Sequence, residues 1–141
     1  MLERTRPIDT PKHNFKNFTE ARLWAKNNIV GSYKNDITGE DISVPKTAID
    51  KYMSASAVLK SIDKDAHLSA LTKLPQLIVT SVLKETKQDR GNNRDIKEIQ
   101  RFYGAVNYEN ETYPVKITVK AYPNGKNKAY SYEVMKKPDN Y

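Results

Sequence analysis

Hydrophobic and polar residues alternate along the last third of the chain, and this pattern predicts three antiparallel strands between Ile99 and Val134. In Tyr113–Ala121, valine and isoleucine occupy every second position, and the positions between them hold Lys116, Thr118 and Lys120. Successive side chains of a strand point to opposite faces of the sheet. One face of this strand is therefore expected to be apolar and the other basic.

The register of the first hairpin depends on where its turn lies. A turn centred on Asn110-Glu111 places Glu109 opposite Thr112. Phe102 and Val106 then join the apolar face. The expected cross-strand neighbours on the other face are Arg101 with Lys120, Tyr103 with Thr118, and Ala105 with Lys116.

The second hairpin carries a stronger turn signal, Asn124-Gly125, because both residues reach positive φ at low cost. A turn centred there places Tyr130, Tyr132 and Val134 on the apolar face. It also places Ser131 beside Thr118 and Glu133 beside Lys116. The two hairpins together gather one set of polar residues, called here the basic face: Arg101, Tyr103, Lys116, Thr118, Lys120, Ser131 and Glu133.

Helical spacing dominates the earlier part of the chain. Asn17 followed by Glu20 is typical of a helix start, and Gly31 ends that helix. A small hairpin is expected from residues 29–33 and 41–44, and a short helix from Pro45 to Met53. Residues 56–87 continue with helical period, and Pro75 must kink or divide that stretch.

Helices first and a sheet last predict an α+β fold, in which N-terminal helices pack on one face of a C-terminal antiparallel β-meander. Residues 1–16 have no periodic apolar pattern and are expected to form a flexible arm. Residues 17–137 are expected to form a single domain, since 141 residues suffice for one core. The basic face would then meet solvent or a ligand.

Composition narrows the class of partner. The formal net charge is +7, and residues 90–137 contribute 10 basic and 5 acidic residues to it. This distribution favours a polyanion as the partner. No apolar run is long enough for a membrane helix, so no membrane partner is expected. The absence of cysteine excludes disulfides and fits a cytoplasmic protein, and the oligomeric state stays open.

Four parts of the sequence resemble a known family: residues 56–61, residues 67–71 with 74–78, Ile99–Val106 and Tyr113–Lys120. They are similar to the large polyvalent protein-associated domains of phages and mobile elements, over residues 42–135. Such domains resemble the barnase, EndoU, colicin and RelE-like nuclease group, in which helices pack on a sheet that carries an RNA site. The resemblance implies metal-independent cleavage of RNA.

That chemistry requires a base, an acid and cations for the phosphorane. The basic face offers Arg101, Lys116 and Lys120 as cations. Glu133 or His67 could act as the base, and His67 has the side-chain type whose ordinary pKa suits proton transfer. Thr118, Ser131 and Tyr103 are neutral donors.

Each of these assignments has a structural alternative. The basic face could be an ordinary solvated sheet surface. His67 shares a helical stripe with Leu71 and Leu74, which favours a histidine at the edge of the core. Tyr130 and Tyr132 could stack on bases, but the expected register favours core packing.

Two further expectations concern the ends of the sheet and the cofactors. Arg90 and Arg94, in the loop before the sheet, are candidate nucleic-acid contacts near Arg101. His13 and His67 lack matching carboxylates, so no metal site is expected, and no cofactor motif is present. The alternative to a nuclease-like domain is a non-catalytic module that binds nucleic acid or protein.

Overall fold

The computed structural model describes residues 6–88 and 98–136 as five helices and a curled seven-stranded sheet. The helices are α1 (Phe18–Asn28), α2 (Lys46–Tyr52), α3 (Ala55–Lys60), α4 (Lys64–Leu71) and α5 (Leu74–Thr80). The strands are β1 (Ile8–Asp9), β2 (Gly31–Lys34), β3 (Asp41–Val44), β4 (Val82–Lys87), β5 (Glu98–Tyr108), β6 (Glu111–Ala121) and β7 (Asn127–Val134). The predicted α+β class is confirmed.

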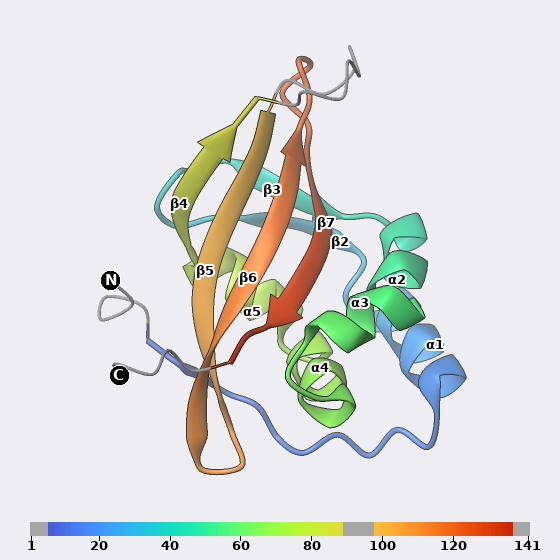
Figure 1. Ribbon diagram of the computed structural model, residues 1–141. Helices are drawn as coiled ribbons and strands as arrows, with labels where there is room; N and C mark the ends of the chain where they lie inside the picture. Colours follow the sequence, from blue (N-terminus) through green and yellow to red (C-terminus); the bar gives the residue numbers. More distant parts are fainter. Residues whose placement is uncertain (1–5, 89–97, 137–141) are drawn as a thin grey trace.

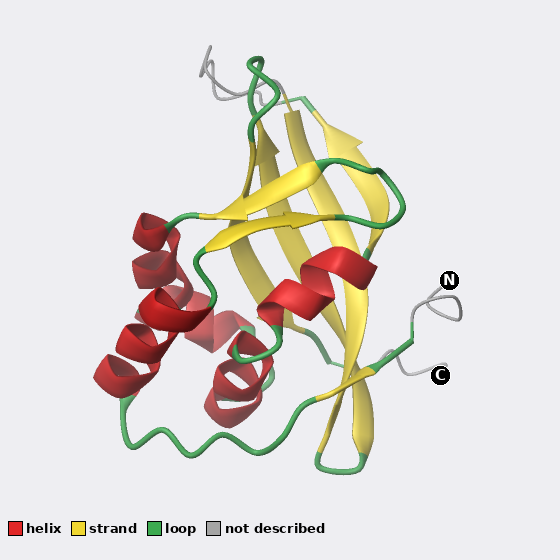
Figure 2. Cartoon of the chain, turned by 180° about the vertical axis from the view of Figure 1, so that it is seen from behind, coloured by secondary structure: helices red, strands yellow, loops and turns green. Residues whose placement is uncertain are grey.

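The sheet is broader than a meander of three strands. Its order is β1-β5-β6-β7-β3-β2, and β4 pairs with β5 beside β1. β1 joins β5 in parallel and β3 joins β7 in parallel, whereas the other pairs are antiparallel. The β2–β3 hairpin crosses behind the long strands in Figure 1 and in front of them in Figure 2, which is seen from behind, and it lies on the same side of these strands as α5.

The core lies between the apolar face of β5–β7 and the helices α4 and α5 (Figure 2). Ile117 on β6 and Leu77 on α5 are buried there. Helix and sheet approach closely at Gly104, where an added Cβ would lie 3.2 Å from Leu77 Cδ2. A side chain at this position would therefore require the Leu77 side chain to shift by a few tenths of an ångström.

Asn35 holds the β2–β3 hairpin against this core. Its side-chain amide donates hydrogen bonds of 2.8 Å to the carbonyls of Ile78 and Ser81, beside the end of α5. Its side-chain oxygen accepts from the backbone N–H groups of Ile37 and Thr38. Asn35 is fully buried, so these four bonds satisfy all of its polar capacity.

The expected register of the first hairpin was wrong by two residues. Glu109 and Asn110 form the turn with φ of 48° and 68°, so Tyr108 pairs with Glu111. Glutamate rarely adopts positive φ, and the sequence therefore gave little sign of this turn. The actual neighbours are Arg101 with Thr118 and Tyr103 with Lys116. An even shift leaves each residue on its expected face.

The second hairpin differs near its tip. Tyr122 and Lys126 hydrogen-bond across a loop of Pro123, Asn124 and Gly125, so that Lys120 pairs with Lys128. A β-bulge then leaves Tyr130 without a partner and restores the expected pairs, Thr118 with Ser131 and Lys116 with Glu133. Tyr130, expected on the apolar face, is instead exposed, and Lys128 joins Lys120 on the other side.

The remaining differences lie in the N-terminal half. Residues 56–87 are not one divided helix, because β4 begins at Val82 and α5 begins at Leu74, with Pro75 in its first turn. The segment expected to be an arm contains β1, which pairs with Val106 and Asn107 of β5. By contrast, α1 begins as predicted, with the Asn17 side chain accepting a hydrogen bond from the N–H of Glu20.

Candidate functional site

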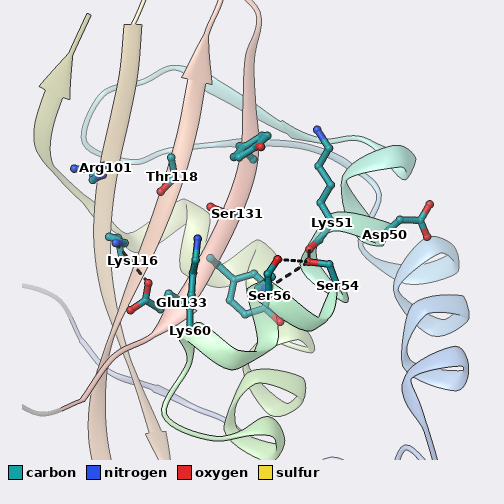
Figure 3. Close-up of a pocket in the computed structure, with 13 residues that line it drawn as sticks. Asp50, Lys51, Ser54, Ser56, Lys60, Arg101, Lys116, Thr118, Ser131 and Glu133 are labelled. Carbon is teal, nitrogen blue, oxygen red and sulfur yellow. Dashed lines mark hydrogen bonds and ion pairs between the residues drawn. The ribbon is translucent and has the colours of Figure 1, made fainter. Parts of the chain in front are cut away.

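A groove of about 550 Å³ separates the strands β5–β7 from the helices α2 and α3. Figure 3 shows Arg101, Lys116 and Glu133 on the strands, and Lys51 and Lys60 extending from the helical wall. The full lining is Asp50, Lys51, Ser54, Ser56, Ala57, Lys60, Arg101, Lys116, Thr118, Tyr130, Ser131, Tyr132 and Glu133. Five of the seven residues of the predicted basic face are among them.

The helical wall is fixed to β7 from the core side. The hydroxyl of Tyr52, at the end of α2, donates a 2.6 Å hydrogen bond to the carbonyl of Ala129. Beyond α3, the hydroxyl of Ser61 accepts from the N–H of Val134 at 2.9 Å, and the N–H of Ile62 donates to the carbonyl of Val134. The width of the groove is therefore set by buried contacts.

Positive charge exceeds negative charge in the groove. Four cations and two carboxylates line it, and both carboxylates already have partners. Glu133 lies 3.5 Å from Lys116, while Asp50 pairs with Arg22 and Lys26 of α1. Lys51 and Lys60 form no ion pair with any residue that the structure describes. These two ammonium groups are available for an anion.

Arg101 lies on β5, on the side of the strand wall that is far from α2 and α3 (Figure 3). One of its terminal nitrogens lies 3.3 Å from the carboxylate of Glu85 on β4, and its Nε is buried without a hydrogen-bond partner. Tyr103, next on the same face, has its pKa raised by burial and by the nearby charge of Glu85. Its phenol therefore stays protonated at neutral pH and can donate a hydrogen bond.

A smaller hollow of about 130 Å³ adjoins the groove and shares Lys51 and Tyr130 with it. Lys120 Nζ lies 3.6 Å from the centre of the Tyr130 ring, and Lys51 Nζ lies 4.7 Å from it. On the same wall, Lys128 Nζ lies 5.1 Å from the centre of the Tyr122 ring. Lys120 therefore belongs to this hollow and does not line the larger groove.

His67 lies in the core and does not line the groove. Its Nδ1 is 2.7 Å from the hydroxyl of Ser61, its Nε2 is 2.8 Å from the carbonyl of Tyr52, and its ring stacks on Tyr132. The side chain is fully buried, and burial lowers the pKa of His67 to about 4. Hydrogen bonds hold the neutral ring in the core. This agrees with the structural alternative for His67, which its helical stripe with Leu71 and Leu74 indicated.

The other predicted residues have different outcomes. Tyr103 shares the face but lines neither hollow, and Arg90 and Arg94 lie outside the described residues. Sequence reasoning missed Lys51, Lys60 and Lys128, and it assigned Tyr130 to the core instead of the site. Pro123-Asn124-Gly125 is a signal for a three-residue loop and could have placed Lys128. Only the tertiary packing of α2 and α3 could have placed Lys51 and Lys60.

Within residues 6–88 and 98–136, no group of three or more His, Cys, Asp or Glu side chains could hold a metal ion. In the same ranges, no helix is both long enough and apolar enough to cross a membrane.

Residues 13–130 match the profile of one protein family, described as large polyvalent protein-associated domain 3. The matched segment includes the groove except for Ser131, Tyr132 and Glu133 at the end of β7. Neither a curated protein nor a solved structure gives a significant match to the chain.

Proposed function

The chain belongs to the family of large polyvalent protein-associated domain 3, and from that premise and the geometry of the groove we propose that it binds single-stranded RNA. The observation that carries the proposal is the surplus of cations in the groove. Lys51 and Lys60 have no ion-pair partner among the described residues, and neither carboxylate of the lining is unpaired. A phosphate backbone supplies anions at regular intervals for such a row of cations.

The shape and the neutral donors favour a single strand. A groove between a sheet and two helices accommodates one strand with its bases turned aside, and Tyr130 at its end offers an aromatic ring for stacking. The hydroxyls of Thr118 and Ser131 lie side by side on the strand wall and can hydrogen-bond to ribose 2′-hydroxyls. These groups favour RNA over DNA.

The proposal is tested by fluorescence anisotropy with single-stranded RNA, single-stranded DNA and duplex RNA in EDTA. Single-stranded RNA should bind most tightly, and the logarithm of its affinity should fall with log salt with a slope of about −3, as for about four phosphate contacts. Lys116→Gln should weaken binding about tenfold. Lys34→Gln on β2 removes the same charge outside the groove and serves as the matched control.

Absence of RNA binding, or equal weakening by Lys116→Gln and Lys34→Gln, would contradict the proposal. Binding of an acidic protein instead of RNA would replace it with the interaction-module function.

A second candidate function is cleavage of the bound RNA, and the position of Glu133 favours it. This carboxylate lies in the groove beside Lys116, where it can take the proton of a 2′-hydroxyl. The 2′-oxygen would attack the adjacent phosphorus, the bond to the 5′-oxygen would break, and an ammonium group such as Lys60 would protonate the leaving oxygen. Lys116 and Arg101 would stabilise the phosphorane charge.

Cleavage is tested with end-labelled RNA in EDTA, with a product carrying a 2′,3′-cyclic phosphate as the expected result. Glu133→Gln should slow cleavage by about 100-fold or more while the fold is retained. Lys120→Ala, at the adjoining hollow, should also reduce it. Equal cleavage by wild type and variants, or none by either, leaves the binding function alone.

A further inference from the structure

The hollow next to the groove has an unusual distribution of charge. Its lining contains three lysines, Lys51, Lys120 and Lys128, and no acidic residue. None of the three forms an ion pair with a residue that the structure describes. The remaining lining consists of two tyrosines, Tyr122 and Tyr130, together with small or apolar residues at the start of α2 and on β7.

Two of these lysines face each other directly. Lys120 on β6 pairs with Lys128 on β7, and like charges in this arrangement destabilise a sheet. The three-residue loop sets this pairing, and the β-bulge changes the register only beyond it, between Val119 and Thr118. The tyrosine rings lie against the ammonium groups and lessen the repulsion without neutralising any charge. The local fold therefore concentrates positive charge in a hollow of about 130 Å³.

We propose that this hollow binds the terminal phosphate of the RNA strand, an inference that rests on the proposed RNA-binding function. Lys51 and Tyr130 line both hollows, so a strand in the groove can pass directly into the lysine pocket. The pocket is defined by Lys51, Lys120 and Lys128. A site for the terminal phosphate would give the bound strand a polarity and a preferred end, which extends the proposed function.

The charge of the ligand supports a terminal phosphate over one within the chain. An internal phosphodiester carries one negative charge, whereas a phosphomonoester carries between one and two near neutral pH. Three ammonium groups without a carboxylate complement the more highly charged group. The hollow is also much smaller than the groove, which suits a phosphate and excludes a complete nucleotide with its base.

The test uses one short RNA sequence prepared in three forms: hydroxyls at both ends, a 5′-phosphate, or a 3′-phosphate. Affinities are measured for the full chain at fixed salt. One phosphorylated form should bind about tenfold more tightly than the hydroxyl form, and its identity gives the polarity of the strand. Lys120→Gln and Lys128→Gln should each remove most of this preference. Lys126→Gln, in the same hairpin but outside the hollow, should preserve it.

The possible failures are distinguishable. Equal affinity for the three RNA forms would overturn the terminal-phosphate proposal and leave RNA binding in the groove intact. A phosphate preference that survives in both Lys120→Gln and Lys128→Gln would also overturn it. Absence of binding by all three forms would contradict the proposed function, and this inference with it. Circular dichroism of each variant shows whether a loss of binding reflects a loss of fold.

Discussion

The two faces of β6 differ in whether the polar groups near them have hydrogen-bond or ion-pair partners. On the apolar side, Ile117 lies against buried residues, and the nearby polar atoms of His67 have hydrogen-bond partners at 2.7 and 2.8 Å. On the other side, the cations outnumber the carboxylates, and Lys51 and Lys60 stay unpaired among the described residues. Satisfied groups are typical of a folding core, and unsatisfied cations are typical of a binding surface.

His67 and Glu133 differ in whether their polar atoms are free to meet a ligand. His67 has the side chain best suited to proton transfer, yet its two ring nitrogens are already committed to Ser61 and Tyr52. Glu133 has no special signature in the sequence, but it lies in the groove beside an ammonium group. Availability to a ligand, more than residue type, separates the two.

The largest contrast should come from two consecutive residues of β6. Ile117→Ala should lower the free energy of unfolding by about 3 to 4 kcal/mol, because it leaves a cavity in the core. Thr118→Val keeps the shape and the strand preference, so it should change stability by less than about 0.5 kcal/mol. It removes a hydroxyl from the groove and should weaken RNA binding. Urea denaturation and anisotropy measure the two effects.

The contrast would fail if Thr118→Val destabilised the protein as much as Ile117→Ala. The basic face would then be a structural surface.

The next effect is a dependence of stability on pH that originates at His67. The pKa of His67 in the folded protein is about 4, below its ordinary value of 6.5, because burial disfavours the charged ring. The contribution of His67 to the free energy of unfolding is complete above pH 6.5 and is lost as the pH falls toward 4. The reason is that His67 binds its proton at a higher pH in the unfolded chain than in the folded protein. The loss should reach about 3 kcal/mol.

His67→Gln isolates this contribution, because glutamine does not titrate. The variant should be less stable at pH 7 but should lose less stability on acidification than the wild type. Asp65, whose pKa is lowered by its hydrogen bond to His13, contributes an acid-dependent loss to both proteins. Parallel pH profiles for wild type and variant would show that His67 does not have the assigned role.

Alternation in the sequence predicted the strand wall of the groove because the period of a strand is two residues. The first turn lies one residue earlier than expected, which shifts the pairing by two residues, so Arg101 pairs with Thr118 instead of Lys120 but stays on the same face. At the second hairpin, a three-residue loop and the bulge at Tyr130 had opposite effects on the register. Their cancellation explains why Ser131 and Glu133 were placed correctly while Lys128 was missed.

The helical wall could not be predicted in the same way. Lys51 and Lys60 are exposed residues of short helices, and neither has a distinctive spacing. Their place in the groove depends on hydrogen bonds between distant parts of the chain, such as Tyr52 with Ala129. Such contacts follow from the packing of the whole fold. Sequence periodicity predicts which face of an element is polar, but not what stands opposite it.

The smallest expected effect concerns the lysine pocket and has the opposite sign. Lys128→Gln removes the repulsion between two lysines that pair directly across β6 and β7, so it should stabilise the protein by a few tenths of a kcal/mol, on the scale of cross-strand pairs. The gain should shrink at high salt, because exposed charges are screened. Urea denaturation at low and high salt measures it, with Lys126→Gln as the control.

A variant that is more stable but binds phosphorylated RNA less well would show that the repulsion serves binding. A loss of stability that is independent of salt would instead assign Lys128 a packing role against Tyr122.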